Sequence, residues 1–318
     1  MKAGVIGVGK LGGAVAFALA REIAWDELVL CDAVEGLAWA QAEDVRHGLR
    51  ADSQTVVRAG EMEDLADADV VVVTAGQGRK PGMTRLDLLH ANAGLVAFLT
   101  KSIASAAPHA TIVMLTNPMD VMTTVAWEAS SLPRERIVGS GTLVDSMRLK
   151  VLLADRFHAN PSEVDAVVLG EHGDRTVPIY SRTRIRGTTV DLTPEEKRQL
   201  LEGLRTLSAR VIEVKGGTAF GPAGCTTALV RALVSETPGV MPASVVLQGE
   251  YGLRDVAVGV PAVLGRGRVL RVEEWPLRSD EQAGLQEAGH DLARFAEDAA
   301  VVLGLAIRHT TLERFAAP

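Results

Sequence analysis

Short, mainly apolar runs alternate with longer Ala- and Leu-rich segments through the first half of the chain. Runs of this length with few charges are typical of strands that are buried on both faces of a sheet. We expect six such strands, at residues 3–7, 27–31, 55–59, 69–74, 111–115 and 137–139. The segments between them predict helices at residues 13–21, 33–49, 84–106 and 121–130. This alternation predicts an α/β fold built on a doubly wound parallel sheet.

The pattern changes after the segment Gly-Ser-Gly-Thr at residues 139–142, which is a candidate domain boundary. Beyond it we expect helices at 143–157, 193–214, 223–235 and 279–308, and strands at 166–169, 179–186, 189–192, 241–248, 256–260 and 267–274. The second of these helices has the clearest start signal, because Thr193 is a capping residue that is followed by Pro194 and then by Glu196. We therefore predict a first domain over residues 1–141 and an α+β domain over residues 142–318.

Composition narrows the class of protein. The chain has 318 residues, 47% of them hydrophobic but only 4% aromatic, so its core consists mainly of Val, Leu, Ile and Ala. The net charge is −7 and no Lys/Arg run is present, which argues against nucleic acid as a partner. No apolar run is long enough for a membrane span, and no leader segment is recognisable. The two cysteines show no metal-ligand spacing, so we expect a reduced, cytoplasmic protein without a metal site.

A glycine-rich turn, G-V-G-K-L-G at residues 7–12, joins the first strand to the first helix. In this context Gly7 permits the tight turn, Gly9 lets a pyrophosphate approach the backbone, and Gly12 allows close packing of helix on strand. Asp32 closes the second strand, at the distance where an acidic residue binds the ribose hydroxyls and repels a 2′-phosphate. We therefore predict a Rossmann domain that binds NAD. The alternative is a packing turn with a helix-capping Asp.

The segment G-E-H-G-D at residues 170–174 places a histidine directly after a short apolar strand. His172 suits proton transfer, because its ordinary pKa lies near neutral pH. Asp145 and Arg148 lie three residues apart on one face of an apolar helix, where buried charges need partners such as His172 and a carboxylate ligand. A solvated turn and an intrahelical ion pair are the alternatives.

Two loops at the ends of predicted strands also carry polar side chains. Asn117 precedes Pro118, a candidate for a cis peptide bond, and its amide faces the expected crevice. Residues 75–85 contain three glycines and a proline and carry Arg79, Lys80 and Arg85. A cationic loop over a cofactor crevice is suited to closing over an anionic substrate. A plain turn and a solvated surface loop remain the alternatives.

These motifs together resemble the lactate/malate dehydrogenase family over nearly the whole chain. The segments that carry the resemblance are GVGKLG with the later Asp, AGQGRKPGMTRLDLL, TNP, GTLVDSMRL and GEHGD, in that order. The resemblance implies that His172 donates and accepts the proton and that Asp145 orients it. It also implies that Arg148 binds the substrate carboxylate as a fork and that Arg85 polarises the reacting carbonyl.

Three further roles follow from the resemblance alone. Asn117 is expected to contact both substrate and nicotinamide. Asn92 is expected to contact the cofactor, and Thr218 to line the substrate pocket. Family members that combine a malate-type sequence with a lactate-dehydrogenase-like plan are commonly tetramers. The resemblance to them implies a homotetramer, with a dimer as the alternative.

The position that selects the substrate in this family corresponds to Arg79. Arg at this point is typical of enzymes for malate, whereas lactate enzymes usually have Gln. Glu171, in contrast, is more usual in lactate enzymes. Gln77-Gly78 departs from the family as a whole, in which small apolar residues are commoner at these two positions. The combination resembles malate dehydrogenases built on a lactate-dehydrogenase-like plan. It predicts reversible hydride transfer between (S)-malate and NAD, giving oxaloacetate, with L-lactate or another L-2-hydroxy acid as the alternative substrate.

Two other classes of protein are weaker alternatives. A hydrolase that uses bound NAD on a related fold would need metal ligands near the substrate, and Cys225 with seven scattered histidines does not suggest them. A purely structural protein would not need the set of His172, Asp145, Arg148 and Arg85.

Overall fold

The computed structural model describes residues 1–78 and 85–304, and for Arg85 and Leu86 it describes the backbone alone. Arg79, Lys80 and Thr84, and the expected end of the last helix near residue 308, lie outside the described residues. Among the residues that the structure describes, no helix is both long enough and apolar enough to cross a membrane.

Six parallel strands form the centre of the fold, in the order β3-β2-β1-β4-β5-β6. They are β1 (Lys2–Ile6), β2 (Glu27–Cys31), β3 (Val56–Ala59), β4 (Val70–Val73), β5 (Thr111–Met114) and β6 (Ile137–Gly139). The four valines of β4 have no exposed surface, because helices cover both faces of the sheet. The predicted α/β class and doubly wound sheet are therefore confirmed.

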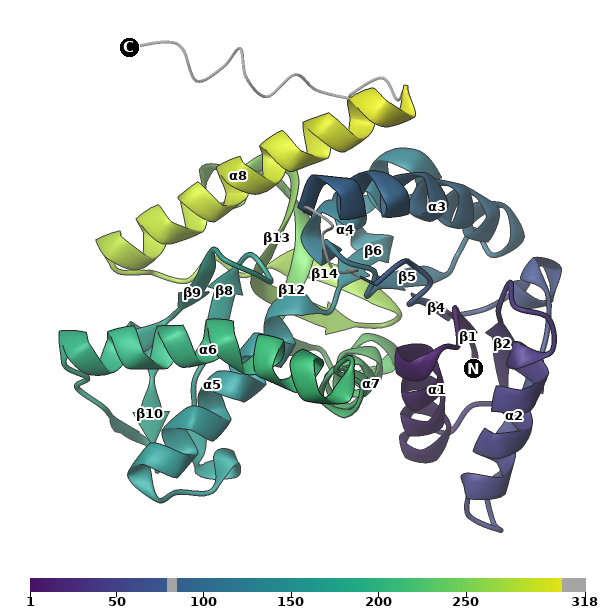
Figure 1. Ribbon diagram of the computed structural model, residues 1–318, viewed down its shortest axis with the longest axis horizontal. Helices are drawn as coiled ribbons and strands as arrows, with labels where there is room; N and C mark the ends of the chain where they lie inside the picture. The colour runs from purple at the N-terminus through teal and green to yellow at the C-terminus, as the bar shows by residue number, and fades with distance from the viewer. Residues whose placement is uncertain (79–84, 305–318) are drawn as a thin grey trace.

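Four helices connect these strands (Figure 1). They are α1 (Lys10–Glu22), α2 (Leu37–Gly48), α3 (Arg85–Ala106) and α4 (Met119–Ser130). Helices α3 and α4 pack against each other, while α1 packs against α7 (Phe220–Val234) from the second half of the chain. The glycine-rich turn at the start of α1 thus faces elements that are distant in sequence.

The second half of the chain continues the same sheet. Strand β6 pairs antiparallel with β12 (Gly239–Gln248), with Ser244 opposite Gly139. Beyond β12 follow β13 (Arg254–Gly265), β8 (Val168–Gly170) and β9 (Thr176–Pro178), while β14 (Arg268–Val272) pairs with β13. The two halves that the sequence suggests are therefore joined by backbone hydrogen bonds as well as by side-chain packing.

The remaining elements surround this extended sheet. The helices are α5 (Gly141–Phe157), α6 (Pro194–Lys215) and α8 (Ser279–Leu303), and a small separate sheet contains β7 (Val164–Asp165), β10 (Arg184–Ile185) and β11 (Thr188–Thr189). Short 3-10 helices occupy Met62–Leu65, Arg134–Arg136, Pro161–Glu163, Tyr180–Arg182 and Glu250–Gly252. Helix α6 starts as predicted, because Thr193 accepts from the Glu196 N–H and the Glu196 carboxylate accepts from the Thr193 N–H.

The expected long strands at 179–186 and 189–192 are wrong. Buried Glu281 accepts hydrogen bonds from the main-chain N–H and the hydroxyl of Ser181, which holds Tyr180–Arg182 in a 3-10 helix. After it, Arg186 and Gly187 both have positive φ, at 51° and 75°. Two consecutive residues of this kind make a tight hairpin, so the strands on either side are only two residues long.

Candidate functional site

The glycine-rich turn has the geometry of a site for a phosphate group. Gly7 adopts φ 88° and lies against Ala75, and a Cβ at Gly12 would overlap the carbonyl oxygen of Gly7. A Cβ at Gly9, in contrast, would meet no protein atom within 4 Å. The first and third glycines are therefore required by packing within the protein, whereas the second leaves open space beside the helix N-terminus, where a pyrophosphate fits.

Asp32 closes β2 beside this turn and is half-buried. Its carboxylate accepts from the main-chain N–H of Val8 at 2.7 Å and from that of Val34 at 2.9 Å. These bonds tie the glycine-rich turn to the end of the second strand. Asp32 does not cap a helix, because α2 begins only at Leu37, after Gly36, and the carboxylate lies at the edge of the turn.

Helix α5 and the loop after β8 bring three predicted side chains together. Nδ1 of His172 lies 2.6 Å from Oδ2 of Asp145, and the other oxygen of that carboxylate accepts from Arg148 at 2.8 Å. The side chain of Asp145 is 6% exposed, compared with 23% for His172 and 19% for Arg148. With Nδ1 engaged by the buried carboxylate, Nε2 is the nitrogen left to face a substrate.

The charges in this cluster act on each other. Burial by itself lowers the pKa of His172, but the carboxylate of Asp145 outweighs that effect, so the pKa is raised above its ordinary value. Burial likewise disfavours ionised Asp145, but His172 and Arg148 outweigh it and hold the pKa of Asp145 below its ordinary value. The arrangement therefore stabilises a protonated imidazole beside an ionised carboxylate.

A second buried carboxylate, Asp120, was not identified from the sequence. It lies in the first turn of α4, is 2% exposed, and its Oδ2 accepts from the main-chain N–H of His172 at 2.8 Å. Burial raises the pKa of Asp120 to about 6, although Ser244 and the His172 N–H counteract this rise. An Asp in the first turn of a helix is so common that nothing in the sequence distinguishes this one.

The Asn117-Pro118 peptide bond is cis, and Asn117 is exposed at the end of β5. Its carbonyl oxygen accepts from Asn92, at 2.7 Å. The amide of Asn92 also exchanges hydrogen bonds with the main chain of Gln77, and the residue has no exposed surface. Asn92 thus braces two loops at the crevice, and the predicted contact between Asn92 and the cofactor stays a prediction.

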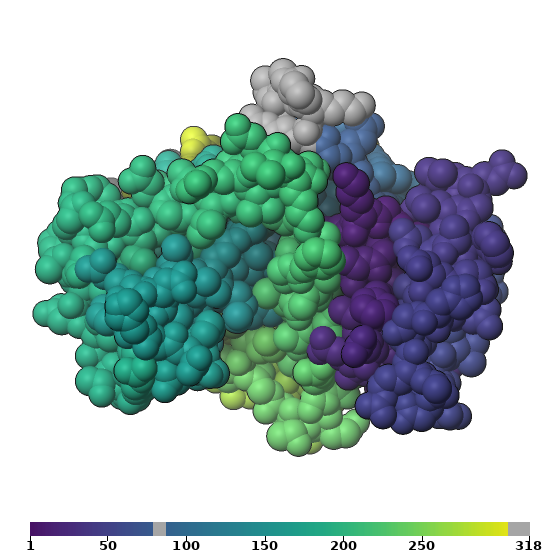
Figure 2. Space-filling model, turned by 60° about the horizontal axis from the view of Figure 1, so that its bottom comes forward, coloured from purple at the N-terminus to yellow at the C-terminus, as the bar shows by residue number. Residues whose placement is uncertain are grey.

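Two cavities adjoin these residues. One, of about 550 Å³, is lined by residues that include Leu11, Thr74, Gly76, Asn117, His172 and Thr218. The other, of about 840 Å³, is bounded by α5, α6 and α7 and is lined by Arg148 and Thr218, among others. Figure 2 shows the surface hollowed between the teal segment of α5 and the green segments of α6 and α7.

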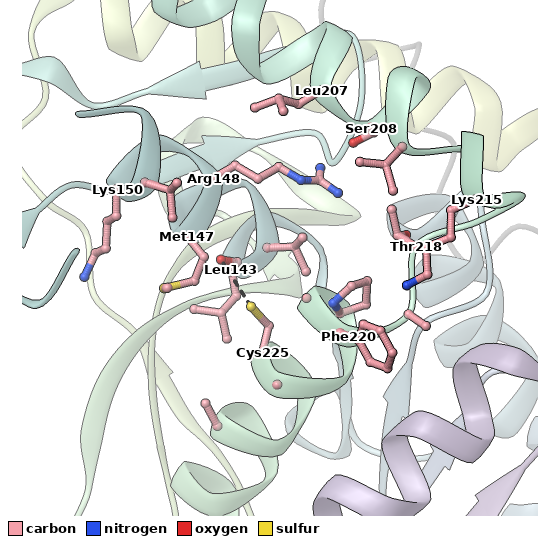
Figure 3. A pocket seen from close by; sticks show the side chains of 18 of the residues that line it. Leu143, Met147, Arg148, Lys150, Leu207, Ser208, Lys215, Thr218, Phe220 and Cys225 are labelled. Atoms are coloured by element: carbon pink, nitrogen blue, oxygen red, sulfur yellow. Dashed lines mark hydrogen bonds between the residues drawn. The ribbon is translucent and has the colours of Figure 1, made fainter. Parts of the chain in front are cut away.

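Thr218 lies at the junction of the two cavities, because it lines both. Figure 3 shows Arg148 extending from α5 into the larger cavity, with Thr218 and Phe220 across from it. The histidine and the arginine of one cluster therefore face spaces that meet at a single residue. Of the other predicted substrate residues, Arg79 and the side chain of Arg85 lie outside the described part of the chain.

Family models match almost the whole chain. Residues 1–139 match the model described as lactate/malate dehydrogenase, NAD binding domain, and residues 142–301 match lactate/malate dehydrogenase, alpha/beta C-terminal domain. The first match, to an NAD-binding domain, agrees with the open space at Gly9 beside the helix N-terminus.

Similar proteins have two different names. A malate dehydrogenase of Halobacterium salinarum is 39% identical over 92% of this chain and 97% of its own length. An L-lactate dehydrogenase of Thermus aquaticus is 38% identical over 96% of this chain and 100% of its own. The solved structure of malate dehydrogenase from Archaeoglobus fulgidus in complex with NADH is 36% identical, covers 94% of this chain and 100% of its own, and has a TM-score of 0.86.

Proposed function

The chain belongs to the lactate/malate dehydrogenase family and is an NAD-dependent oxidoreductase, and from this premise we propose that it interconverts (S)-malate and oxaloacetate. The observation that carries the 2-hydroxy acid chemistry is the pair of His172 and Asp145, 2.6 Å apart at the wall of a cavity. The choice of malate within that class depends on Arg79.

His172 is the acid and base of the proposed reaction. In oxidation, neutral His172 accepts the hydroxyl proton at Nε2, while Nδ1–H remains directed at Asp145. In reduction, the imidazolium returns that proton to the oxygen of the substrate. Asp145 keeps the ring oriented and favours its charged form, and both effects lower the cost of moving the proton.

The arginines of the site orient the substrate. Arg148 takes the C1 carboxylate as a planar fork, since one of its nitrogens is held by Asp145 and its side chain reaches into the cavity. Arg85 polarises the carbonyl, and Asn117 and Thr218 complete the pocket walls. The exposure of Asn117 at the crevice and the position of Thr218 between the two cavities support these roles.

NAD, when bound, supplies the hydride chemistry, and the protein supplies its position. Gly7, Gly9 and Gly12 form the pyrophosphate turn, and Asp32 takes the ribose hydroxyls and excludes a 2′-phosphate. Asn117 contacts the nicotinamide end, and Asn92 contributes a further cofactor contact. The open space at Gly9 and the bonds that fix Asp32 beside the turn support this assignment.

Malate is favoured over lactate as the substrate because malate and oxaloacetate carry a second carboxylate, which lactate and pyruvate lack. Such a charge is costly to bury without a partner, and Arg79 supplies one. The second candidate is L-lactate or another L-2-hydroxy acid, which is favoured by relatives of similar identity that are named L-lactate dehydrogenase. The identity of the substrate is therefore a question of one side chain within a shared mechanism.

The assembly, domain boundary and compartment are part of the same proposal. We propose an NAD domain over residues 1–141 and a substrate domain over 142–318, which the ranges of the two family models support. We propose a homotetramer, with a dimer as the smaller alternative, in the cytoplasm. The apolar rim of the larger cavity supports self-association, because Met147, Val151 and Phe220 are exposed there.

The deciding experiment measures NADH oxidation with oxaloacetate and with pyruvate under matched conditions. A kcat/KM that is higher for oxaloacetate supports malate as the substrate, whereas a higher value for pyruvate assigns the enzyme to lactate. Repeating the better reaction with NADPH tests Asp32, because equal use of both cofactors would remove its proposed role. Sedimentation of the same preparation gives the oligomeric state.

A further inference from the structure

Asp120 is a buried carboxylate with few polar contacts in the fold. Among the described residues, its carboxylate accepts one hydrogen bond, from the main-chain N–H of His172, and a neutral side-chain oxygen could accept that bond as well. Its other oxygen, Oδ1, lies near the hydroxyl of Ser244 but makes no hydrogen bond within the described structure. Burying a carboxylate with one partner is costly, so the ionised group needs an explanation beyond that one bond.

The surroundings of Asp120 compensate for part of this cost. The carboxylate lies in the first turn of α4, where the helix dipole favours negative charge. The charged groups that face it are His172, which favours its ionised form, and Asp145, which disfavours it. The imidazole of His172 is therefore influenced by two buried carboxylates, one at its ring nitrogen and one at its backbone.

We propose that Asp120 is a positioning residue for His172: it anchors the main chain so that Nδ1 meets Asp145, and its negative charge favours the imidazolium. This inference rests on the proposed role of His172 as acid and base. It adds a second charge to a mechanism that would otherwise depend on Asp145 alone.

The position of Asp120 also links two parts of the site. Asp120 lies three residues after Asn117, at the start of the helix that follows the cis peptide bond. The bond to His172 spans 52 residues of sequence and joins this turn to the loop after β8. This hydrogen bond therefore ties the turn that carries the proposed amide contact directly to the residue that carries the proposed acid.

The test is an NMR titration of the histidine rings in the full chain, comparing wild type with Asp120→Asn. The amide can still accept the His172 N–H but carries no charge. We expect the pKa of His172, assigned by the resonance lost in His172→Asn, to fall by about one pH unit, as removal of a nearby opposite charge should produce. The alkaline limb of kcat/KM for keto-acid reduction should move in the same direction, with NADH affinity unchanged.

Two further variants separate positioning from simple stability. Asp120→Ala removes the acceptor as well, and should lower kcat by a larger factor than Asp120→Asn while leaving KM for NADH unchanged. Glu281→Gln is the matched control, because Glu281 is also buried and also accepts from a main-chain N–H, but at Ser181, away from the site. It should lower thermal stability and leave the titration of His172 unchanged.

An unchanged His172 pKa in folded Asp120→Asn would overturn the proposal. So would failure of both Asp120 variants to fold while Glu281→Gln folds, because Asp120 would then be a residue required for folding. Failure of the proposed function would be seen in a different experiment. In that case His172→Asn would retain turnover. The NMR titration would still test the role of Asp120, because it does not depend on proton transfer by His172.

Discussion

Nδ1 of His172 and Oδ2 of Asp145 lie 2.6 Å apart, although the residues are 27 positions apart in the chain and belong to different elements. Asp145 comes from α5, and His172 follows the short strand β8. The same carboxylate binds Arg148 through its other oxygen. One buried group thereby sets the protonation of the proposed acid and the orientation of the proposed carboxylate fork.

Replacing His172 by Asn should remove nearly all turnover, because the proposed proton donor is lost. General acid–base groups contribute on the order of 10²–10⁴-fold to rate. Binding of NADH, measured by fluorescence titration, should be unchanged, because the glycine-rich turn is untouched. Near-normal turnover in this variant would contradict the role of His172, and His290→Asn, which changes a histidine outside the site, is the control.

The pair of His172 and Asp145 also makes stability depend on pH. The raised pKa of His172 contributes stability that is complete below its ordinary value of 6.5 and is lost as pH rises through the folded value. The lowered pKa of Asp145 contributes stability that is present above 3.8 and is lost as pH falls through the folded value. The difference in Tm between wild type and Asp145→Asn should therefore be largest between about pH 4 and 6.5.

A Tm difference that is flat across this range would contradict the coupling of the two groups. Turnover of Asp145→Asn should also be lower than that of wild type, because the imidazolium loses the charge that stabilises it. Asp155→Asn, at the exposed end of the same helix, is the control for the loss of one carboxylate from α5.

Gly9 and Gly12 should respond oppositely to Ala. A Cβ at Gly12 would overlap the Gly7 carbonyl, so Gly12→Ala should lower Tm and the yield of folded protein. A Cβ at Gly9 would meet no protein atom, so Gly9→Ala should fold normally and bind NADH more weakly. Thermal unfolding and NADH titration of the two variants test this contrast, and normal NADH affinity in Gly9→Ala would exclude a close approach of the pyrophosphate.

Substitution of Arg79 by Gln should change the choice of substrate. Losing one partner of a buried ion pair costs roughly 3–5 kcal/mol, which corresponds to about two to three decades in kcat/KM for oxaloacetate. Reduction of pyruvate should increase. In the wild type, pyruvate leaves Arg79 without a carboxylate partner, and the neutral Gln of the variant removes that cost. The measurement is kcat/KM for both acids in wild type, in Arg79→Gln and in the neighbouring control Lys80→Gln. An oxaloacetate-to-pyruvate ratio that does not change would remove the main support for malate.

The sequence predicted the parts of this fold that depend on local pattern. The valine run of β4 and the capping residues at Thr193 are readable because burial on both faces and helix capping depend on nearby residues. The pairing of β6 with β12 is not readable, since neither strand contains information about its neighbour. The 3-10 helix at Tyr180–Arg182 was missed for a related reason, because it depends on Glu281, 100 residues after Ser181.

The residues of the candidate site also fall into two groups, those predicted from a local motif and those whose role depends on a distant contact. His172, Asp145 and Arg148 carry a recognisable spacing and motif, and the structure brings them into contact. Asp120 was missed because its significance comes from one hydrogen bond across 52 residues. The bracing role of Asn92 was also missed, because a buried amide and an exposed one are identical in sequence.

The pairing of β6 with β12 has a consequence for any attempt to separate the two halves. A truncated protein ending near residue 141 would leave β6 as an edge strand, with Ile137 and Val138 newly uncovered. The remaining fragment would present β12 in the same state, with the apolar residues around Val245 at its edge. Unpaired apolar edges of this kind recruit other strands. We therefore expect each half expressed alone to aggregate, and the two halves to fold only together.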